Sequence, residues 1–309
     1  MKPLLVLGSI NADLYIRVAA LPRPGETIPG REAAVRPGGK GANQAAAAAR
    51  QGYPVRFAGY VGDDSFAPML RRALTDTGAD ASLLRSAPGP SGQALILLQD
   101  GGENSIILVP GANHAWPAGI DRLLAEAITG AGVLLLQREI PEAINSAAAA
   151  EARRQQVPVV LDVGGDDGPI APELLACLSV ISPNETELER LTGMPADTAK
   201  SAEAAARVLL ARGPSAVLVK RGAEGALWVP REGPALAHPA YRARVVDTTG
   251  AGDCFTATVA AGMCAGLSPE HLLGRACAAA SVCVEALGAM PAMPDAAAVA
   301  AREAQIPGA

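Results

Sequence analysis

The chain reads Asp247-Thr248-Thr249-Gly250-Ala251-Gly252-Asp253 directly before residues 254–266, a run with the composition of a helix. Small residues ahead of a helix allow consecutive backbone N–H groups to point into one space, where the helix dipole adds partial positive charge. This predicts an anion site that a phosphate would fit. Asp253 is unexpected there, because a carboxylate repels an anion. It either takes a proton from a hydroxyl that attacks the phosphate or caps the helix, and the motif alone leaves both roles open.

Strands alternate with helices along most of the chain. Apolar runs typical of buried strands occupy residues 4–7, 55–61, 133–136, 157–161, 180–181, 216–220, 226–229 and 245–246. Helical composition occupies residues 40–51, 68–75, 141–155, 171–178, 202–211 and 269–286. Such alternation predicts an α/β fold with a mostly parallel sheet and helices on both faces. We expect residues 1–309 to form a single domain, since no repeat or low-complexity linker divides them.

A second glycine motif, Gly38-Gly39-Lys40-Gly41-Ala42-Asn43-Gln44, opens an alanine-rich helix. Small residues let a ligand approach the backbone closely, and the motif adds a lysine cation and an asparagine amide on one turn. It is not a Walker A loop, because no Ser or Thr follows the lysine. A purely structural turn into a helix is the alternative.

Two segments do not fit the alternating pattern. Residues 23–37 are rich in Pro, Gly and charge, and residues 94–99 and 105–109 are apolar runs joined by a turn typical of a hairpin. We expect insertions at about 13–37 and 92–110 to form a small sheet outside the main fold. It is either a mobile lid or a rigid interface.

Several expected strands end on polar residues. Asn11 and Asp13 follow the first strand in an expected loop, Glu139 and Asp162 follow later strands, and Asn184 precedes a helix. Ligands bind at the carboxyl edge of open parallel sheets, so we expect this edge to be the site. The nearby carboxylates, Glu187 among them, either favour the helix N-terminus or contact a magnesium ion through water.

Composition excludes several classes of function. The net charge of −5 argues against a broad nucleic-acid surface, and five cysteines without C-x-x-C spacing are typical of reduced thiols. The chain starts with a strand-like run rather than a signal peptide, and no apolar run is long enough to span a bilayer. We expect a soluble intracellular protein.

The two glycine motifs have complementary chemistry, and together they resemble the signatures of the ribokinase-like (PfkB) carbohydrate kinase family. Further similar stretches are Gly8-Ser9-Ile10-Asn11-Ala12-Asp13, Pro24-Gly25-Glu26 and Ser182-Pro183-Asn184-Glu185-Thr186-Glu187, so the resemblance covers nearly the whole chain. It implies a three-layer α/β/α domain with a small β-sheet lid. Gln137-Arg138-Glu139-Ile140-Pro141 and Asp162-Val163-Gly164-Gly165 are most similar to plant and algal members.

The resemblance also implies roles for individual residues. Asn11, Asp13, Gly39, Lys40, Asn43 and Glu139 would hold a sugar. Asp253 would be the catalytic base, with the amides of Gly250, Ala251 and Gly252 as the anion hole. ATP would be held by Asn184, by Lys220, Arg221, Gly222, Ala223, Glu224 and Gly225, by Gly252 and by Cys277, which stands where relatives commonly have His or Asn.

Two metal ions are implied in the same way. Mg²⁺ would be bound through water by Glu187. K⁺ would lie near Asp247 and Thr249, with carbonyls from Cys283, Ala286 and Gly288 and with Ala292 where a serine is common.

The function implied is ATP-dependent phosphorylation of D-ribose at its 5-hydroxyl. The alternatives are a kinase for another sugar or nucleoside, and a non-catalytic binding protein that kept the fold. A homodimer through the lid is expected, and the plant-like stretches suggest the chloroplast stroma, with the cytoplasm as the alternative.

Overall fold

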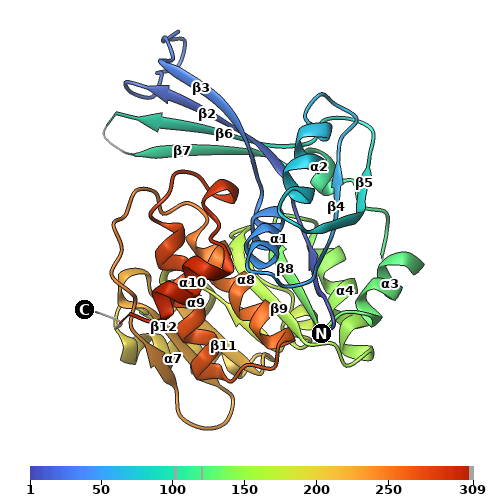
Figure 1. Ribbon diagram of the computed structural model, residues 1–309, viewed down its shortest axis with the longest axis vertical. Helices are drawn as coiled ribbons and strands as arrows, with labels where there is room; N and C mark the ends of the chain where they lie inside the picture. The colour runs from blue at the N-terminus through green and yellow to red at the C-terminus, as the bar shows by residue number, and fades with distance from the viewer. Residues whose placement is uncertain (101–102, 120, 306–309) are drawn as a thin grey trace.

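The computed structural model describes residues 1–100, 103–119 and 121–305. Over these residues one large sheet has nine strands in the order β13-β12-β11-β10-β9-β8-β1-β4-β5 (Figure 1). Pairing is parallel from β11 to β5, and β12 and β13 are antiparallel additions. The strands are β1 (Leu4–Leu7), β4 (Val55–Val61), β5 (Asp80–Ser86), β8 (Val133–Arg138), β9 (Val159–Gly165), β10 (Val180–Ser182), β11 (Ala216–Lys220), β12 (Ala226–Pro230) and β13 (Leu236–His238).

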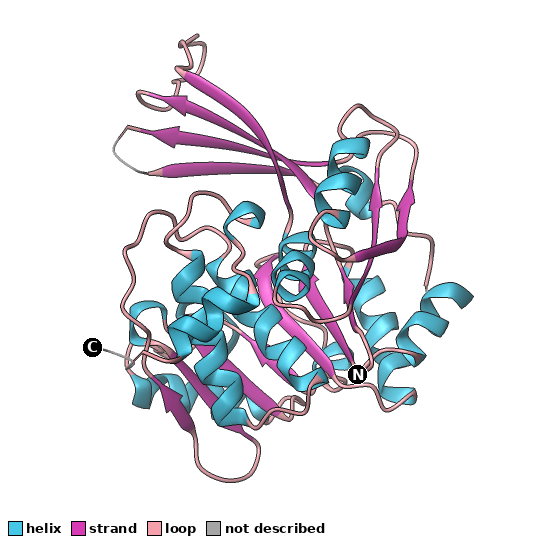
Figure 2. Cartoon of the chain, in the orientation of Figure 1, coloured by secondary structure: helices cyan, strands magenta, loops and turns pink. Residues whose placement is uncertain are grey.

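Helices cover both faces of the large sheet (Figure 2). Alternate residues of a strand point to opposite faces, so Leu4 and Val6 join one hydrophobic cluster while Leu5 and Leu7 join the other. The first cluster contains residues of α1 (Lys40–Arg50), α2 (Ala67–Thr75), α8 (Ala251–Cys264), α9 (Pro269–Cys283) and α10 (Ala296–Glu303). The second contains residues of α3 (Arg122–Thr129), α4 (Glu142–Arg154), α5 (Pro172–Leu175), α6 (Glu185–Thr192) and α7 (Ala199–Leu210). The expected three-layer α/β/α fold is confirmed.

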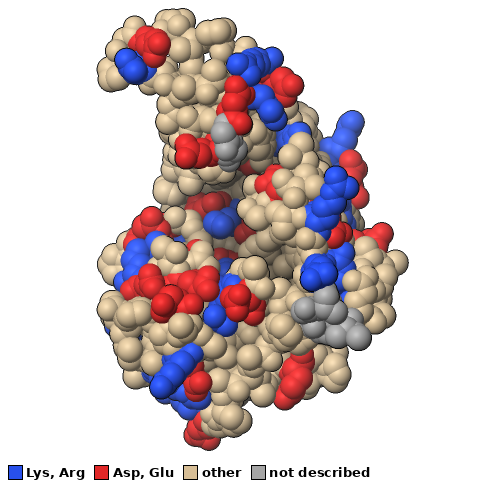
Figure 3. All heavy atoms as spheres, turned by 90° about the vertical axis from the view of Figure 1, so that its left-hand side faces the viewer, with Lys and Arg blue, Asp and Glu red and all other residues tan. Residues whose placement is uncertain are grey.

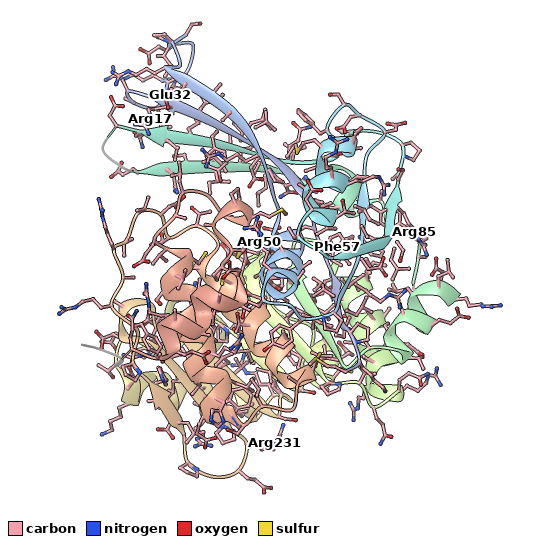
Figure 4. All side chains as sticks on the ribbon, viewed as in Figure 1. Arg17, Glu32, Arg50, Phe57, Arg85 and Arg231 are labelled. Atoms are coloured by element: carbon pink, nitrogen blue, oxygen red, sulfur yellow. The ribbon has the colours of Figure 1, made fainter. Side chains whose placement is uncertain are left out.

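Alanine allows the helices to approach the sheet and one another closely. Ala45 to Ala48 of α1 are fully buried, and Phe57 of β4 fills the space beside them (Figure 4). Small side chains on α8, such as Ala257 and Ala260, belong to the same cluster. This packing brings the N-termini of α1 and α8 together at the carboxyl edge of the sheet.

A small sheet stands off this edge (Figures 1 and 2). It contains β2 (Asn11–Val18), β3 (Glu32–Gly38), β6 (Gly92–Gln99) and β7 (Asn104–Val109) in the order β3-β2-β6-β7. Arg17 and Glu32, 3.7 Å apart, join β2 and β3 near its outer end (Figure 4). In sequence, these four strands coincide closely with the segments of about 13–37 and 92–110 that were expected to lie outside the main fold.

The two faces of the small sheet differ in chemistry. Asp13 shares a row with Ala94 and Leu108, whereas the next row is formed by Val35, Leu14, Leu95 and Ile107. Neighbouring residues on a strand point to opposite faces, so this apolar row lies on the face away from Asp13. Its outer members are well exposed, Val35 by 47% and Ile107 by 56%.

Several local expectations were wrong. Residues 245–246 form no strand: both valines are exposed, and Val246 donates its N–H to the Val284 carbonyl at the end of α9. Asn11 and Asp13 lie in a strand rather than a loop, because β2 pairs with β3 and β6 from Asn11 onward. The sequence interpretation did not identify β5, α3, β13 or α10. Within the described ranges, no helix has the length and apolarity needed to cross a bilayer.

Candidate active site

Asp253 lies in the first turn of α8, at the junction with α1. Gly250 (φ 81°) is the N-cap of α8 and the helix begins at Ala251, so the alternative in which Asp253 caps the helix is wrong. The Asp253 side chain instead accepts two hydrogen bonds from α1, from Asn43 Nδ2 at 2.9 Å and from Gln44 Nε2 at 3.3 Å. Asp253 is only 5% exposed. The carboxylate is therefore held away from the amides of its own helix.

The three residues expected to form an anion hole lie immediately before Asp253. Ala251 and Gly252 are in the first turn of α8, where backbone N–H groups have no partner within the helix. The Ala251 N–H is donated to the Thr248 carbonyl at 3.2 Å. In this state the Ala251 amide closes the preceding turn, and an incoming anion would have to compete with Thr248 for it.

Lys40 balances the charge of Asp253. Its Nζ lies 3.7 Å from Asp253 Oδ1. The Asp253 carboxylate, together with Asp162 and Glu139, raises the pKa of Lys40 despite its burial. Burial raises the pKa of Asp253, and the Lys40 ammonium opposes this shift. A raised carboxyl pKa suits a general base, because a base works best when its pKa lies near the working pH.

The expected sugar-binding residues meet at the base of the small sheet. Glu139 Oε2 accepts hydrogen bonds from Ser9 Oγ at 2.6 Å and from the Lys40 backbone N–H at 3.0 Å. Glu139 and Asn11 line a cavity of about 360 Å³. Gly39 is the N-cap of α1 with φ 88°, and a Cβ there would lie 2.9 Å from the Asn11 backbone nitrogen. Only glycine allows this approach of strand and helix.

Asp13 is the second unusual carboxyl of this region. It is 8% exposed, and its Oδ1 is buried with no hydrogen-bond partner among the described residues. Burial raises its pKa to about 7, and the nearby carboxylates of Glu139 and Asp253 add to this shift. An unpartnered buried acceptor costs free energy unless a ligand donates to it. A sugar hydroxyl is a donor of the required kind.

A second, larger cavity of about 520 Å³ has Gly252 among its lining residues. The expected ATP-binding residues that line it are Lys220, Gly222, Ala223, Gly225, Gly252 and Cys277. Arg221, Glu224 and Asn184 are not among its lining residues. Arg221 lies 3.9 Å from Glu185, and Asn184 is the N-cap of α6. The volume of this cavity is within the range of cavities that bind small molecules.

Lys220 lies beside the candidate anion hole. A Cβ on Gly252 would be 3.8 Å from Lys220 Nζ. The same Nζ donates to Asp162 Oδ2 at 3.0 Å, and Thr256 Oγ1 of α8 donates to that oxygen at 2.6 Å. Burial would raise the pKa of Asp162, but the ammonium groups of Lys220 and Lys40 outweigh it and lower that pKa.

The expected K⁺ ligands come from two segments that are hydrogen-bonded to each other. Asp247 accepts from the Thr249 N–H and hydroxyl and, through its other oxygen, from the Gly288 N–H at 2.8 Å. Burial raises the pKa of Asp247, but these hydrogen bonds outweigh it and lower the pKa. Cys283 is the last residue of α9, and Ala286, in the segment after the helix, donates its N–H to the Cys283 carbonyl. Ala292 lies in the buried helix η3 (Met290–Ala292). Ionised carboxylate, hydroxyl and carbonyl oxygens are suitable ligands for K⁺.

The expected Mg²⁺ contact, Glu187, forms a capping box with Asn184: each side chain accepts the other's backbone N–H at 2.8 Å. In the part of the chain that the structure describes, no group of three or more His, Cys, Asp or Glu side chains could hold a metal ion directly. A Mg²⁺ ion carried by nucleotide phosphates and bound through water needs only such a single carboxylate.

Sequence reasoning assigned no role to four residues of the site. Ser9 donates to Glu139, Asn113 of η1 (Gly111–His114) donates to Asn11 Oδ1 at 2.6 Å, and Gln137 donates to Gln44. The available signal was a polar residue inside an apolar run: Gln44 precedes five alanines, and Gln137 follows three leucines. On the space-filling surface, the molecule is hollowed beneath the small sheet, with acidic and basic side chains in the hollow (Figure 3).

Known proteins are similar to this chain in sequence and in fold. Residues 1–296 match the model of the pfkB family carbohydrate kinases. The chain is 47% identical over 298 residues to ribokinase of Arabidopsis thaliana, covering 95% of this chain and 79% of that protein. It is 38% identical over 256 residues to deoxyribokinase of Salmonella typhi, covering 81% and 82%. The structure of Arabidopsis thaliana ribokinase complexed with ribose and ATP matches with a TM-score of 0.95 and 44% identity over 99% of both chains. The chain belongs to the pfkB family of carbohydrate kinases.

Proposed function

We propose that this protein transfers the γ-phosphoryl group of ATP to the 5-hydroxyl of D-ribose. One observation carries the proposal: the buried Asp253 carboxylate of the second glycine motif contacts Lys40 and Asn43 of the first. Its neighbour Gly252 lines the 520 Å³ cavity. The relative that matches with a TM-score of 0.95 was solved with ribose and ATP.

In the proposed reaction Asp253 accepts the proton of the 5-hydroxyl as the sugar oxygen attacks the γ-phosphorus. A new phosphorus–oxygen bond forms, the bond to the β–γ bridging oxygen breaks, and ADP leaves. Asn11, Asp13, Gly39, Lys40, Asn43 and Glu139 hold the sugar in line with ATP. The amides of Gly250, Ala251 and Gly252, with Lys220 beside them, stabilise negative charge on the transferring group.

The remaining nucleotide and metal residues complete the proposal. Asn184 and the Lys220–Gly225 turn, with Cys277, would border ATP, with Asn184, Arg221 and Glu224 outside the lining of the 520 Å³ cavity, and Glu187 would contact Mg²⁺ through water. When bound, Mg²⁺ neutralises phosphate charge, and K⁺ stabilises the turn before the anion hole. Asp247 and Thr249, with the carbonyls of Cys283, Ala286 and Gly288 and with Ala292, would surround K⁺. The hydrogen bond from Gly288 to Asp247 supports this assignment, because it holds the two contributing segments together.

We assign the small sheet to the same functional unit as a lid, so that residues 1–309 act as one kinase domain. Asn11 and Asp13 belong to this sheet, whereas Lys40 and Asp253 belong to the body. A sugar that bridges the two parts would favour their closure and exclude water from the reaction.

A homodimer through the small sheet is part of the proposal. Its support is the row of Val35, Leu14, Leu95 and Ile107, which crosses all four strands on the face away from Asp13. Exposed apolar surface of this kind is typical of protein–protein contact.

The chloroplast is our proposed location, supported by the 47% identity with the Arabidopsis protein, and imaging of a fluorescent fusion would test it.

A coupled assay of ADP release tests the substrate. ATP and Mg²⁺ are offered with D-ribose, 2-deoxyribose, fructose or adenosine, each with and without K⁺. The highest kcat/KM is expected with D-ribose, and added K⁺ is expected to increase it. Preference for 2-deoxyribose, the sugar named for the Salmonella relative, would keep the mechanism and replace the substrate. ADP release with none of the acceptors would favour a non-catalytic binding protein.

The substitution Asp253→Asn tests the base. Asparagine preserves the shape of the side chain but cannot take the proton, so kcat should fall by about 10²–10⁴-fold. Binding of D-ribose and of ATP, measured by calorimetry, should change by less than about threefold. Near-normal turnover in this variant would show that Asp253 is not the base.

A further inference from the structure

Two buried glutamines form a hydrogen-bonded chain that ends on Asp253. Gln137 Nε2, on β8, donates to Gln44 Oε1 at 2.7 Å, and Gln44 Nε2 donates to Asp253 Oδ1 at 3.3 Å. Both glutamines are fully buried. We propose that Gln44 and Gln137 are positioning residues that fix the Asp253 carboxylate and keep it ionised for catalysis. This inference rests on the proposed role of Asp253 as the base.

The order of donors and acceptors determines how the chain works. The Gln44 side chain has one carbonyl oxygen and one NH₂ group. Because its oxygen accepts from Gln137, its NH₂ group must face Asp253. In the opposite orientation the amide oxygen would face a carboxylate oxygen, which cannot donate when ionised. With Gln137 as the donor, Gln44 has the orientation that supports the charged form of Asp253, while Gln137 Oε1 has no hydrogen-bond partner among the described residues.

The far end of the chain is anchored to a third element. Asn145 Nδ2 of α4 donates to the Gln137 backbone carbonyl at 2.7 Å. Gly8 leaves the space that Gln137 occupies, because a Cβ on Gly8 would lie 2.0 Å from Gln137 Oε1. The chain thus connects α4, β8 and α1 with the start of α8. Its members are held by packing as well as by hydrogen bonds.

The charges around Asp253 explain why such support is needed. Asp162 from β9 and Glu139 from the end of β8 disfavour its ionisation, and Asp13 from β2 lies near enough to repel it. From α1, Lys40 at 3.7 Å and the amides of Asn43 and Gln44 favour it. Removing the Gln44 donor leaves the Lys40 ammonium and the Asn43 amide to oppose burial and three carboxylates. The acid-side limb of the pH–rate profile should then move to higher pH.

The experiment uses methionine, which has nearly the length and volume of glutamine but no amide. The variants are Gln44→Met and Gln137→Met. The control is Gln51→Met: Gln51 follows α1, is 5% exposed, and donates to Thr258 Oγ1 at 2.8 Å rather than to Asp253. The pH dependence of kcat is measured from about pH 5 to pH 9 with saturating ATP and D-ribose. Thermal unfolding of each variant is measured in parallel.

In Gln44→Met the acid-side limb should move up by about one pH unit, so kcat at pH values below the wild-type limb should fall by roughly tenfold. Gln137→Met should move the limb in the same direction by a smaller amount, since Gln44 can then rotate. Gln51→Met should lose thermal stability but keep the wild-type limb. Because Gln137→Met leaves the direct contact to Asp253 in place, it tests the chain even if Gln44→Met does not fold.

Two results would overturn the inference. One is a wild-type limb in both Gln44→Met and Gln137→Met, and the other is an equal shift in Gln51→Met, which would indicate general loosening of the core. Asp253→Asn separates this failure from failure of the proposed function. If Asp253→Asn loses turnover while the glutamine variants keep the wild-type profile, only the positioning role is wrong. If Asp253→Asn remains active, the base itself is wrong.

Discussion

Carboxylates outnumber ammonium groups at the centre of the site. Asp13, Glu139, Asp162 and Asp253 meet there with Lys40 and Lys220, and Asp13, Asp162 and Asp253 are buried. Leaving a buried charge without its partner is strongly destabilising. Before ligands bind, repulsion among these carboxylates therefore destabilises the site. Sugar hydroxyls and a Mg²⁺-bound nucleotide would supply the missing donors and positive charge.

Asp13 should make unfolding dependent on pH. Burial raises its native pKa from 3.8 to about 7, so the native state binds more protons than the unfolded state between these values. Stability must therefore fall as pH rises through this range. In the absence of ligands, the unfolding free energy of Asp13→Asn minus that of wild type should increase by about 2 kcal/mol from pH 5 to pH 8. Urea unfolding at both pH values measures the difference.

A matched variant guards against a general effect of removing charge. Asp76→Asn removes an exposed carboxylate after α2, and its difference from wild type should stay constant between the two pH values. A constant difference for Asp13→Asn as well would show that Asp13 is not buried as an uncompensated acid.

At the scale of single residues, motif residues could be located from sequence and their partners could not. Lys40, Asn43 and Asp253 stand in two compact motifs, and the structure brings them together. Asn113, 102 residues from Asn11, binds its side chain, and no local pattern shows such a pair. Spacing indicates which residues share a turn, whereas partners far apart in the chain depend on the packing of whole elements.

Helix α10 stabilises one wall of the 520 Å³ cavity proposed to bind ATP. Arg302 donates to the Arg242 carbonyl at 3.0 Å and to Ser281 Oγ at 2.9 Å, and pairs with Glu285. Glu285 also accepts from the Arg244 backbone N–H at 3.0 Å. Residues 240–243 and 245 line the cavity without belonging to a helix or strand. Arg302 thus supplies order that this segment cannot obtain from regular structure.

Arg302→Leu should therefore weaken nucleotide binding more than sugar binding. The KM for ATP is expected to rise by about tenfold, the equivalent of one or two lost hydrogen bonds. Arg275→Leu is the control, because Arg275 also joins α9 to α10, through Glu303 at 2.9 Å, but makes no hydrogen bond to residues 240–245 within the described part of the chain. Steady-state kinetics with each substrate varied in turn measures both constants. Equal changes in both variants would contradict the role of Arg302.

Elements were predictable where their apolar pattern was strong. The strands around Leu4, Val133 and Ala216 are short apolar runs and form as expected. β5 was missed because Asp80–Ser86 mixes polar and apolar residues without clear alternation, and it pairs at the edge of the sheet. Val245 and Val246 have the composition of a strand, but no strand in the described ranges pairs with them, and Val246 donates to the Val284 carbonyl instead. Tertiary packing decides such cases.

On the scale of the whole molecule, the small sheet provides the test of assembly. Ile106 and Ile107 are equally exposed, by 54% and 56%, but lie on opposite faces of β7. Ile107→Lys introduces a charge into the apolar row and should convert a dimer to a monomer at micromolar concentration. Ile106→Lys, on the face of Asp13, should leave the dimer intact. Light scattering after size-exclusion chromatography distinguishes these outcomes, and a monomeric wild type would contradict the assignment.

The apolar row also has a consequence for how two active sites would communicate. Asp13 and Leu14 are adjacent residues of β2, so Asp13 faces the side of the sheet proposed to bind the sugar and Leu14 belongs to the apolar row on the other side. A strand that shifts when sugar binds on one face must shift its contacts on the other. In a dimer joined at these rows, occupation of one site would therefore change the affinity of the second. Ribose saturation would then depart from a simple hyperbola, and the Hill coefficient would return to one when Ile107→Lys separates the subunits.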